Sequence, residues 1–361
     1  MIGHRGFWLG AIGSAAFLIV FILLFVDFDT IGDVVGSANY AYVAPALIFY
    51  FLAVHFRAVR WRFLLRPLMG RPQRAIYPVV VVGYMANNLI PVRIGEVLRS
   101  YYLSIREPVS AAGAFGTVAV ERASDVLALL FFLGLAAFFL PVTGTLDDLA
   151  AQIPGGTTVL VLAALLPFLV VTGTVVFITA LSPETVLRLV ERLASPVPEK
   201  FRLRLLSLVG RLLEGLIVVR SPRALLSVFI LSLPVWTLEA AMYYTISFGF
   251  DLRSSFGSTP EFIAVILVFT AAANLAGVLP SSAGSWGPFD FFGTAALVAL
   301  GAPFDVASVF ALTVHVALWV PVTALGLAVL VIDGTSLRRL MRRAREDKQA
   351  LVPRPSPGSN S

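Results

Sequence analysis

The chain alternates between long apolar runs and short polar connections, and six of the runs are long enough to be membrane-spanning helices. A helix needs about 20 mostly apolar residues to cross a hydrocarbon core of about 30 Å. Continuous runs indicate helices, because the strands of a membrane barrel alternate apolar and polar side chains. The six predicted spans are Trp8–Val26, Ala41–Phe56, Ala111–Leu140, Val159–Leu181, Ala224–Phe248 and Val306–Ile332.

Composition supports a membrane protein and excludes several kinds of chemistry. Hydrophobic residues make up 58% of the chain and charged residues 13%, with a mean hydropathy of +0.89, which leaves too little polar surface for a soluble globule. The chain has no cysteine, and its three histidines are widely separated in the sequence. We therefore expect an all-α polytopic membrane protein with no metal site and no cofactor.

The distribution of arginine predicts how the chain is oriented. Most arginines lie in residues 55–74, 188–223 and 338–346, whereas the other connections are acidic or nearly neutral. By the positive-inside rule the arginine-rich segments face the cytoplasm, and six spans then place both termini there. We expect a prokaryotic plasma-membrane protein with a single transmembrane domain, 1–335. A basic, disordered cytoplasmic tail, 336–361, follows it.

Two further apolar segments, Ala75–Pro91 and Glu261–Pro280, do not fit this orientation as full crossings. Each would leave and return on the same side, the first on the basic side and the second on the acidic side. We interpret both as re-entrant helical hairpins. Each half of the chain, 1–148 and 150–335, then has two spans, a hairpin and a third span, with opposite orientation. This arrangement is an inverted-topology repeat, in which binding sites lie near the midplane.

The first hairpin carries the motif NNLIPVRIGEVLR, in which polar and charged residues interrupt an apolar run. Proline favours a turn and glycine permits close backbone approach. Arginine recognises phosphate with a bidentate fork, so the motif predicts a headgroup site. The alternative is a surface ion pair between Glu96 and Arg99. The candidates are Asn87, Asn88, Arg93, Glu96 and Arg99 for binding, and Pro91 and Gly95 for the turn.

Charged residues also occur in the interior of predicted spans. Glu121, Arg122 and Asp125 lie about ten residues into the third span, and ionised groups at that depth need a partner or water. They form either an internal salt bridge between helices or a site for substrate or a coupling ion, unless the span starts later and they are shallow. Glu239 and His315 are further candidates for coupling, although a lone buried histidine is more often a packing residue.

The second hairpin contains the sequence LPSSAGSWGPFD, which is rich in small residues. Its hydroxyl groups and backbone N–H groups at the start of a half-helix can receive an anionic group. A tight turn of small residues is the alternative. The candidates are Asn274, Ser281, Ser282 and Asp290 for binding, and Pro280, Gly284 and Gly287 for the turn.

These motifs, together with RAVRWRFLL and VERASDVLALL, resemble the lysylphosphatidylglycerol synthase transmembrane region family over about residues 8–332. The resemblance implies a multi-helix, flippase-like module that moves lipids between leaflets. It places the family's functional positions on Pro91, Gly95, Glu96, Arg99, Glu121, Arg122, Asp125, Pro280, Gly284 and Gly287. The family commonly has glutamate where Asp290 stands. About 29 residues follow the last span, so we expect no aminoacyl-transferase domain and do not transfer the name synthase.

We therefore predict a non-enzymatic lipid transporter for an anionic, amino-acid-modified or sugar-modified lipid. The sequence lacks the G-x-x-x-x-G-K-[ST] loop, so we expect no ATP hydrolysis by this chain. Its expected partners are membrane lipids and a separate lipid-modifying enzyme, not nucleic acid. Two alternatives remain open: an integral-membrane enzyme that acts on phospholipid or polyprenyl-linked substrates, and a non-transporting scaffold for a lipid-modifying enzyme.

Overall fold

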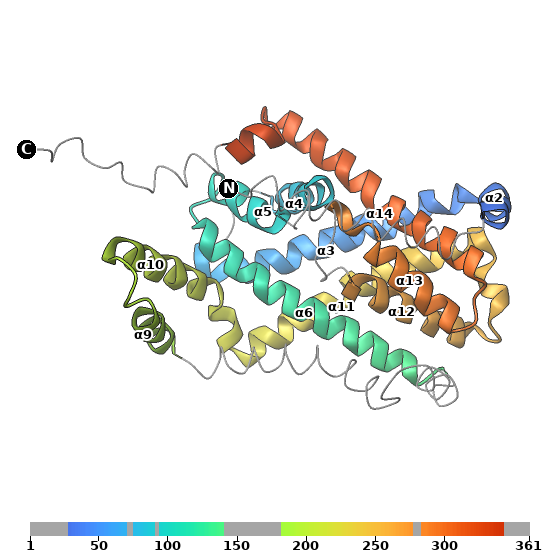
Figure 1. The fold of residues 1–361 in the computed structure, drawn as a ribbon, viewed down its shortest axis with the longest axis horizontal. Helices are drawn as coiled ribbons and strands as arrows, with labels where there is room; N and C mark the ends of the chain where they lie inside the picture. Colours follow the sequence, from blue (N-terminus) through green and yellow to red (C-terminus); the bar gives the residue numbers. More distant parts are fainter. Residues whose placement is uncertain (1–27, 71–74, 91–93, 141–181, 277–282, 343–361) are drawn as a thin grey trace, which may run out of the picture.

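The structure is a computed structural model that describes residues 28–70, 75–90, 94–140, 182–276 and 283–342 (Figure 1). Within these ranges the regular elements are all helical. The longer helices are α2 (Phe28–Ser37), α3 (Val43–Met69), α4 (Tyr77–Leu89), α5 (Gly95–Ser104), α6 (Ala111–Ala137), α9 (Pro183–Leu193), α10 (Glu199–Gly215), α11 (Pro222–Ser247), α12 (Thr259–Ala276), α13 (Pro288–Ala299) and α14 (Phe304–Ile332).

Four long helices, α3, α6, α11 and α14, run along the long axis of the molecule (Figure 1). α3 and α11 are antiparallel, because Tyr42 at the start of α3 contacts Phe248 just after the end of α11. α14 runs in the direction of α3, and α6 in the direction of α11 (Figure 1). In the described residues, α3 of the first half therefore runs opposite to α11 of the second half, and α6 runs opposite to α14.

Among the described residues, four helical segments are long and apolar enough to cross a membrane: Tyr40–Met69, Pro222–Phe250, Thr259–Ala276 and Phe304–Ile332. Three of them contain spans predicted from the sequence. α6 is as long as α3 but carries three ionised residues near its middle. The predicted spans Trp8–Val26 and Val159–Leu181 lie outside the described residues.

The outer surface of the long helices is apolar, as lipid contact requires. Ile48 on α3, Leu226 on α11 and Val320 on α14 are all exposed. Large aromatic side chains instead fill the interior, among them Trp61, which is completely buried. Because lipid is as apolar as a leucine side chain, exposed apolar residues carry no penalty in a membrane. The chain is therefore built as a multi-pass membrane protein.

Two pairs of shorter helices fill the space between the long ones. α4 and α5 lie toward the end where α3 finishes, and α12 and α13 lie toward the end where α3 begins (Figure 1). At 1.5 Å per residue the 13 residues of α4 extend only about 20 Å, too short for a crossing. α12 alone has the length of a span, so the re-entrant hairpin at Glu261–Pro280 stays a prediction.

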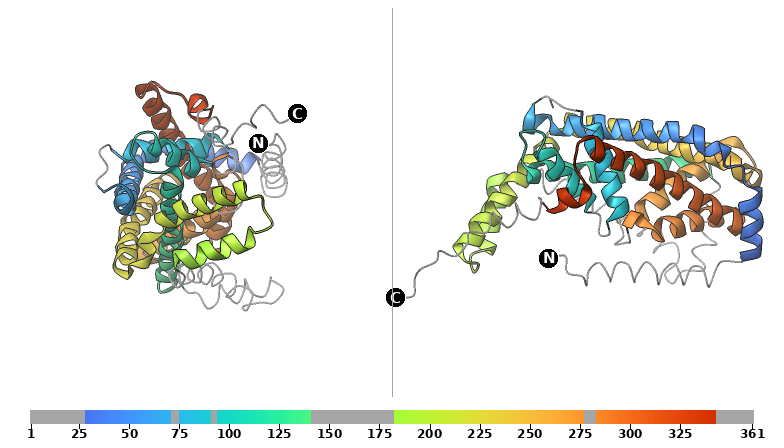
Figure 2. Two further views of the ribbon diagram at one scale, coloured as in Figure 1. Left: turned by 90° about the vertical axis from the view of Figure 1, so that its left-hand side faces the viewer. Right: turned by 90° about the horizontal axis from the view of Figure 1, so that it is seen from above.

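A separate pair, α9 and α10, projects from the end of the bundle where α3 finishes and α6 begins (Figure 2). Near the same end, residues 337–342 are helical and Leu340 is 1% exposed. The folded part thus extends beyond residue 335, where the sequence analysis placed its boundary, because Leu340 packs into the core.

Candidate functional site

A cavity of about 190 Å³ lies between the two short helix pairs. The tips of both pairs border it, because Asn87 and Asn88 come from the end of α4 and Asn274 from the end of α12. Gly284 and Ser285, which precede α13, complete the second tip. The two segments predicted to be hairpins therefore meet at one cavity.

The cavity wall combines charge with aromatic rings. Two guanidinium groups, three carboxylates and one imidazole line it, together with five aromatic side chains. Carboxylates thus outnumber guanidinium groups. The charged residues are Arg57, Arg122, Glu96, Asp125 and Glu239, with His315 as the imidazole; the aromatic residues are Tyr50, Tyr84, Trp236, Phe289 and Trp319.

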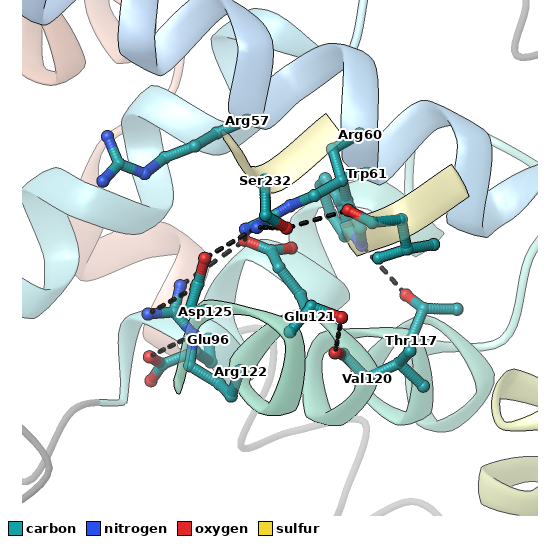
Figure 3. Close-up of polar contacts among 12 residues, drawn as sticks. Arg57, Arg60, Trp61, Glu96, Thr117, Val120, Glu121, Arg122, Asp125 and Ser232 are labelled. Carbon is teal, nitrogen blue, oxygen red and sulfur yellow. Dashed lines mark hydrogen bonds and ion pairs between the residues drawn. The ribbon is translucent and has the colours of Figure 1, made fainter. Parts of the chain in front are cut away.

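A buried ion network, shown in Figure 3, adjoins the cavity, because Arg122 and Asp125 belong to both. Arg60, which is completely buried, donates hydrogen bonds of 2.6 Å to both Asp125 and Ser232. Arg60 Nη2 also lies 3.2 Å from Glu121 Oε1. Glu121 in turn accepts a 2.9 Å hydrogen bond from Arg99, so one carboxylate joins α3, α5 and α6. Such groups are stable in the interior because each charge faces an opposite one.

Arg122 is the accessible cation of this network. Its side chain is 38% exposed, and its nitrogens lie 3.4 Å from Glu121, 3.5 Å from Asp125 and 4.0 Å from Glu96. Figure 3 shows it facing both Asp125 and Glu96. Because Arg122 is partly exposed and lines the cavity, a ligand in the cavity can reach its guanidinium group.

A second chain of polar contacts crosses the cavity wall. Arg57 donates a hydrogen bond to Glu239, and its guanidinium carbon lies 5.2 Å from the centre of the Trp236 ring. The Tyr243 hydroxyl donates to Glu239 Oε1 over 2.8 Å and accepts from Asn274 Nδ2 over 3.2 Å. The tip of α12 is therefore connected through α11 to α3.

The first tip is held by its two asparagines. Asn87 Oδ1 accepts a 2.7 Å hydrogen bond from the Gly95 N–H, so its amide caps the start of α5. A Cβ at residue 95 would overlap both the Gly83 carbonyl and the Asn87 side chain, which explains the glycine. Asn88 Nδ2 donates to Thr323 Oγ1 over 2.9 Å and fixes the tip to α14.

The second tip is held by an imidazole and a carboxylate. His315 Nδ1 lies 2.9 Å from Asp290 Oδ1, and His315 Nε2 lies 2.8 Å from the Gly284 carbonyl oxygen. Asp290 also accepts from the Gly287 N–H over 3.1 Å, which caps α13. Gly284 has a φ of +74°, a conformation that L side chains rarely adopt. The Trp286 ring stacks on the imidazole at 4.2 Å.

The contacts of His315 require a proton. A carbonyl oxygen can only accept, so Nε2 carries a hydrogen. Nδ1 can then bond Asp290 only if the imidazole is doubly protonated or the carboxyl group is protonated. In both cases the pair holds one proton more than a neutral imidazole and a free carboxylate.

The structure brings most of the predicted site residues together, but in different roles. Asn87, Asn88, Glu96, Arg122, Asp125, Asn274, Glu239 and His315 line the cavity. Arg99 and Glu121 form an ion pair behind the wall, so Arg99 does not line the cavity, and its carboxylate partner is Glu121 and not Glu96. Arg93, Pro91, Pro280, Ser281 and Ser282 lie outside the described residues.

Sequence reasoning missed the roles of Arg57 and Arg60. It assigned both to a cytoplasmic connection after a span ending at Phe56, whereas α3 continues to Met69 and buries both guanidinium groups. Their spacing of three places them on one helical face. A signal was available, because the carboxylates predicted inside the bundle need cationic partners. These carboxylates are Glu121, Asp125 and Glu239. In the described part of the chain no cluster of metal-ligating side chains occurs.

Comparison with known proteins gives the family. The sequence model of the lysylphosphatidylglycerol synthase transmembrane region family matches residues 7–326. The chain therefore belongs to this family. The chain is 27% identical over 310 residues to the glycosyltransferase AglD of Haloferax volcanii, covering 81% of this chain and 48% of AglD. It therefore spans about half the length of that relative.

Two other relatives carry only a general membrane-protein description. A UPF0104 membrane protein of Methanothermobacter thermautotrophicus is 26% identical over 321 residues, covering 86% of this chain and 88% of the relative. A UPF0104 membrane protein of Methanocaldococcus jannaschii is 33% identical over 129 residues, covering 35% of this chain and 38% of the relative. No solved structure matches the chain. The relatives support a lipid-related function in the membrane.

Proposed function

We propose that the protein is a flippase-like transporter that moves a lipid headgroup across the bilayer through the cavity. The observation that carries the proposal is that both helix tips, which enter from opposite ends, border one cavity that charged side chains line. The opposite directions of the two halves support an inverted-topology repeat with two re-entrant hairpins. Rocking of one half against the other would open the cavity to each leaflet in turn.

The charges of the cavity favour an amino-acid-modified or sugar-modified headgroup over a bare anionic one. The cavity guanidinium groups already have carboxylate partners, Arg57 with Glu239 and Arg122 with Asp125. An amine or a hydroxyl can meet the carboxylates, and the rings suit a cation or the apolar face of a sugar. Arg122 is the group we assign to the lipid phosphate.

The size of the cavity indicates which part of the lipid it would hold. About 190 Å³ is below the 300–1,000 Å³ of typical small-molecule pockets. A volume of this size suits a headgroup better than acyl or prenyl chains. The chains would therefore stay in the bilayer while the headgroup passes between the helix tips.

We assign proton coupling to His315 and Asp290. Glu121, Asp125 and Glu239, the other candidates, are each paired with a guanidinium group, which keeps its charge. The His315 pair is different, because its contacts require a proton that an imidazole exchanges readily. Loss of the proton would release Gly284 or Asp290 and loosen the second tip.

The remaining parts of the proposal follow from the arginine distribution and the site. We place the protein in a prokaryotic plasma membrane with both termini in the cytoplasm. We assign no catalytic residues to it.

A second candidate function is that of a membrane partner of a separate lipid-modifying enzyme. The similarity to about half of a protein named as a glycosyltransferase favours that candidate.

The proposal is tested by reconstituting the full chain in liposomes. Translocation would be measured for fluorescent phosphatidylglycerol, lysylphosphatidylglycerol and a polyprenyl-phosphate sugar. We expect the lysyl lipid or the sugar lipid to move faster than phosphatidylglycerol. Arg122→Gln should slow that movement at least tenfold, because a hydrogen bond to a charged group contributes about 1.5–3 kcal/mol.

The matched control is Arg62→Gln, which removes an equal charge from an exposed position of α3 outside the cavity wall. It should transport as the unaltered protein does. Equal rates for Arg122→Gln and Arg62→Gln would contradict the proposed site. Mass spectrometry of the recovered lipid separates the other candidates, since a chemically changed lipid indicates an enzyme. Absence of movement together with a co-purifying soluble enzyme indicates a scaffold.

A further inference from the structure

The helices α9 and α10 expose large apolar side chains outside the bundle. Leu193 on α9 is 71% exposed, and Phe201 and Leu208 on α10 are 56% and 50% exposed. Burying such surface gains about 25 cal/mol per Å² relative to water. These side chains lie on two helices that contact each other.

The apolar residues of each helix share one face. Leu189 and Leu193 are four residues apart on α9. Phe201, Leu205 and Leu208 follow the i, i+4, i+7 spacing on α10. A neighbouring face of α10, about a quarter turn away, carries Lys200, Arg204, Ser207 and Arg211, and Leu203 is exposed on the far side. Both helices are thus amphipathic, and the apolar face of each remains partly uncovered.

The base of this pair is fixed to the bundle by close backbone packing. The end of α10 crosses the start of α6 where glycines meet, because a Cβ at Gly215 would overlap the Gly113 carbonyl and lie 2.9 Å from Gly116 Cα. Small residues allow helices to approach in this way. α9 and the beginning of α10 extend beyond this anchor (Figure 2). The exposed face therefore has a defined position relative to the spans.

We propose that α9 and α10 lie on the anionic lipid surface of the cytoplasmic leaflet. Residues 183–215 contain six basic and four acidic residues, and several of the basic ones are exposed beside the leucines. Exposed Arg62 and Arg66 of α3 lie toward the same end, which the positive-inside rule assigns to the cytoplasm. Apolar side chains flanked by arginine insert at the headgroup boundary of anionic bilayers.

Covalent continuity with a span favours lipid as the occupant. The end of α10 passes through the short helix Ile217–Arg220 directly into α11, a candidate span. The exposed face is thereby held near the bilayer edge. Its attachment to lipid would brace the half of the molecule that contains α11 to α14. This inference does not depend on which lipid the cavity binds.

The experiment uses the absence of cysteine, because each introduced cysteine then carries a single label. Phe201→Cys, Leu205→Cys and Leu193→Cys would be spin-labelled in the full chain, with Ser207→Cys on the polar face of α10 as the matched control. The proteins would be placed one per nanodisc, in phosphatidylcholine alone or with phosphatidylglycerol. Collision rates with oxygen, which enters the bilayer, and with a water-soluble nickel chelate report the depth of each label.

We expect the oxygen-to-nickel ratio to be several-fold higher at the three apolar positions than at residue 207. Omission of phosphatidylglycerol, or high salt, should reduce this difference. Equal ratios at all four positions would overturn the proposal. Labels shielded from both reagents at the apolar positions would show that protein covers this face. Oxygen-to-nickel ratios that do not change with phosphatidylglycerol content or salt would overturn the proposal that the lipid surface must be anionic. Unchanged thermal unfolding of each variant shows that the fold is retained.

Discussion

The two helix tips at the cavity are held in different ways. The α4–α5 tip rests against a dense network in which Arg60, Arg99 and Glu121 are almost completely buried. The tip before α13 is held by one imidazole–carboxylate pair, His315 with Asp290. Both tips also use backbone capping, by Asn87 at Gly95 and by Asp290 at Gly287.

The difference concerns what can change the position of each tip. A guanidinium group stays charged at every physiological pH, so the first tip rests on permanent charges. The second depends on a proton that imidazole can lose. We infer that the first tip is the fixed side of the cavity and the second the side that responds to its surroundings. Three substitutions, in order of decreasing expected effect, test this comparison.

The largest effect is expected for Glu121→Gln. Its carboxylate faces Arg60, Arg99 and Arg122, and its loss leaves buried cations without their main partner. Breaking a buried pair costs about 3–5 kcal/mol. Chemical unfolding in detergent measures the loss. Glu96→Gln, at a half-buried position 4.0 Å from Arg122, should cost less than about 1 kcal/mol. Similar losses for both would show that the network does not depend on Glu121.

A smaller effect is expected for Gly95→Ala, which forces a methyl group against the Gly83 carbonyl and the Asn87 amide. Overpacking of this kind costs about 1–3 kcal/mol. Gly134→Ala is the control, because nothing lies within 4 Å of its Cβ and alanine favours a helix by up to about 1 kcal/mol. Thermal unfolding of the two variants should therefore shift in opposite directions. A stabilised Gly95→Ala protein would contradict the described geometry of the first tip.

The smallest change in stability, about 0.5–1.5 kcal/mol, is expected for His315→Gln, which loses buried hydrogen bonds. Its diagnostic effect is local, because both ring nitrogens of His315 contact the second tip. Hydrogen exchange of residues 283–299, measured at a single pH, should be faster in the variant than in the unaltered protein. Residues 95–104 of the first tip should exchange at the same rate in both proteins, and unchanged rates at both tips would show that His315 does not hold the second tip.

Several features of the fold could be predicted from the sequence because they depend on local pattern. The apolar runs at Ala41–Phe56, Ala224–Phe248 and Val306–Ile332 all fall within helices. The asparagines and the glycine of the first motif do mark the point where α4 ends and α5 begins. A change from apolar to polar residues is visible in one dimension, since burial in lipid requires every residue of a span to be apolar or partnered.

Other features depended on where arginines lie in three dimensions. Arg57 and Arg60 follow an apolar run like an ordinary cytoplasmic anchor, yet they are buried. Arg99, expected at a headgroup, points instead toward Glu121 and lies over the Trp61 ring at 4.6 Å. Helical spacing gives the face of a residue but not the helix that will cover that face.

The sequence by itself determined the class of protein, the main helices and the presence of carboxylates inside the bundle. Only the tertiary structure decided which charges neutralise one another and which remain open to the cavity. Arg57 and Glu239 are 182 residues apart in the chain, and His315 reaches Asp290 across the turn between α13 and α14. Such pairs depend on how the helices pack, and hydrophobic periodicity does not specify that packing.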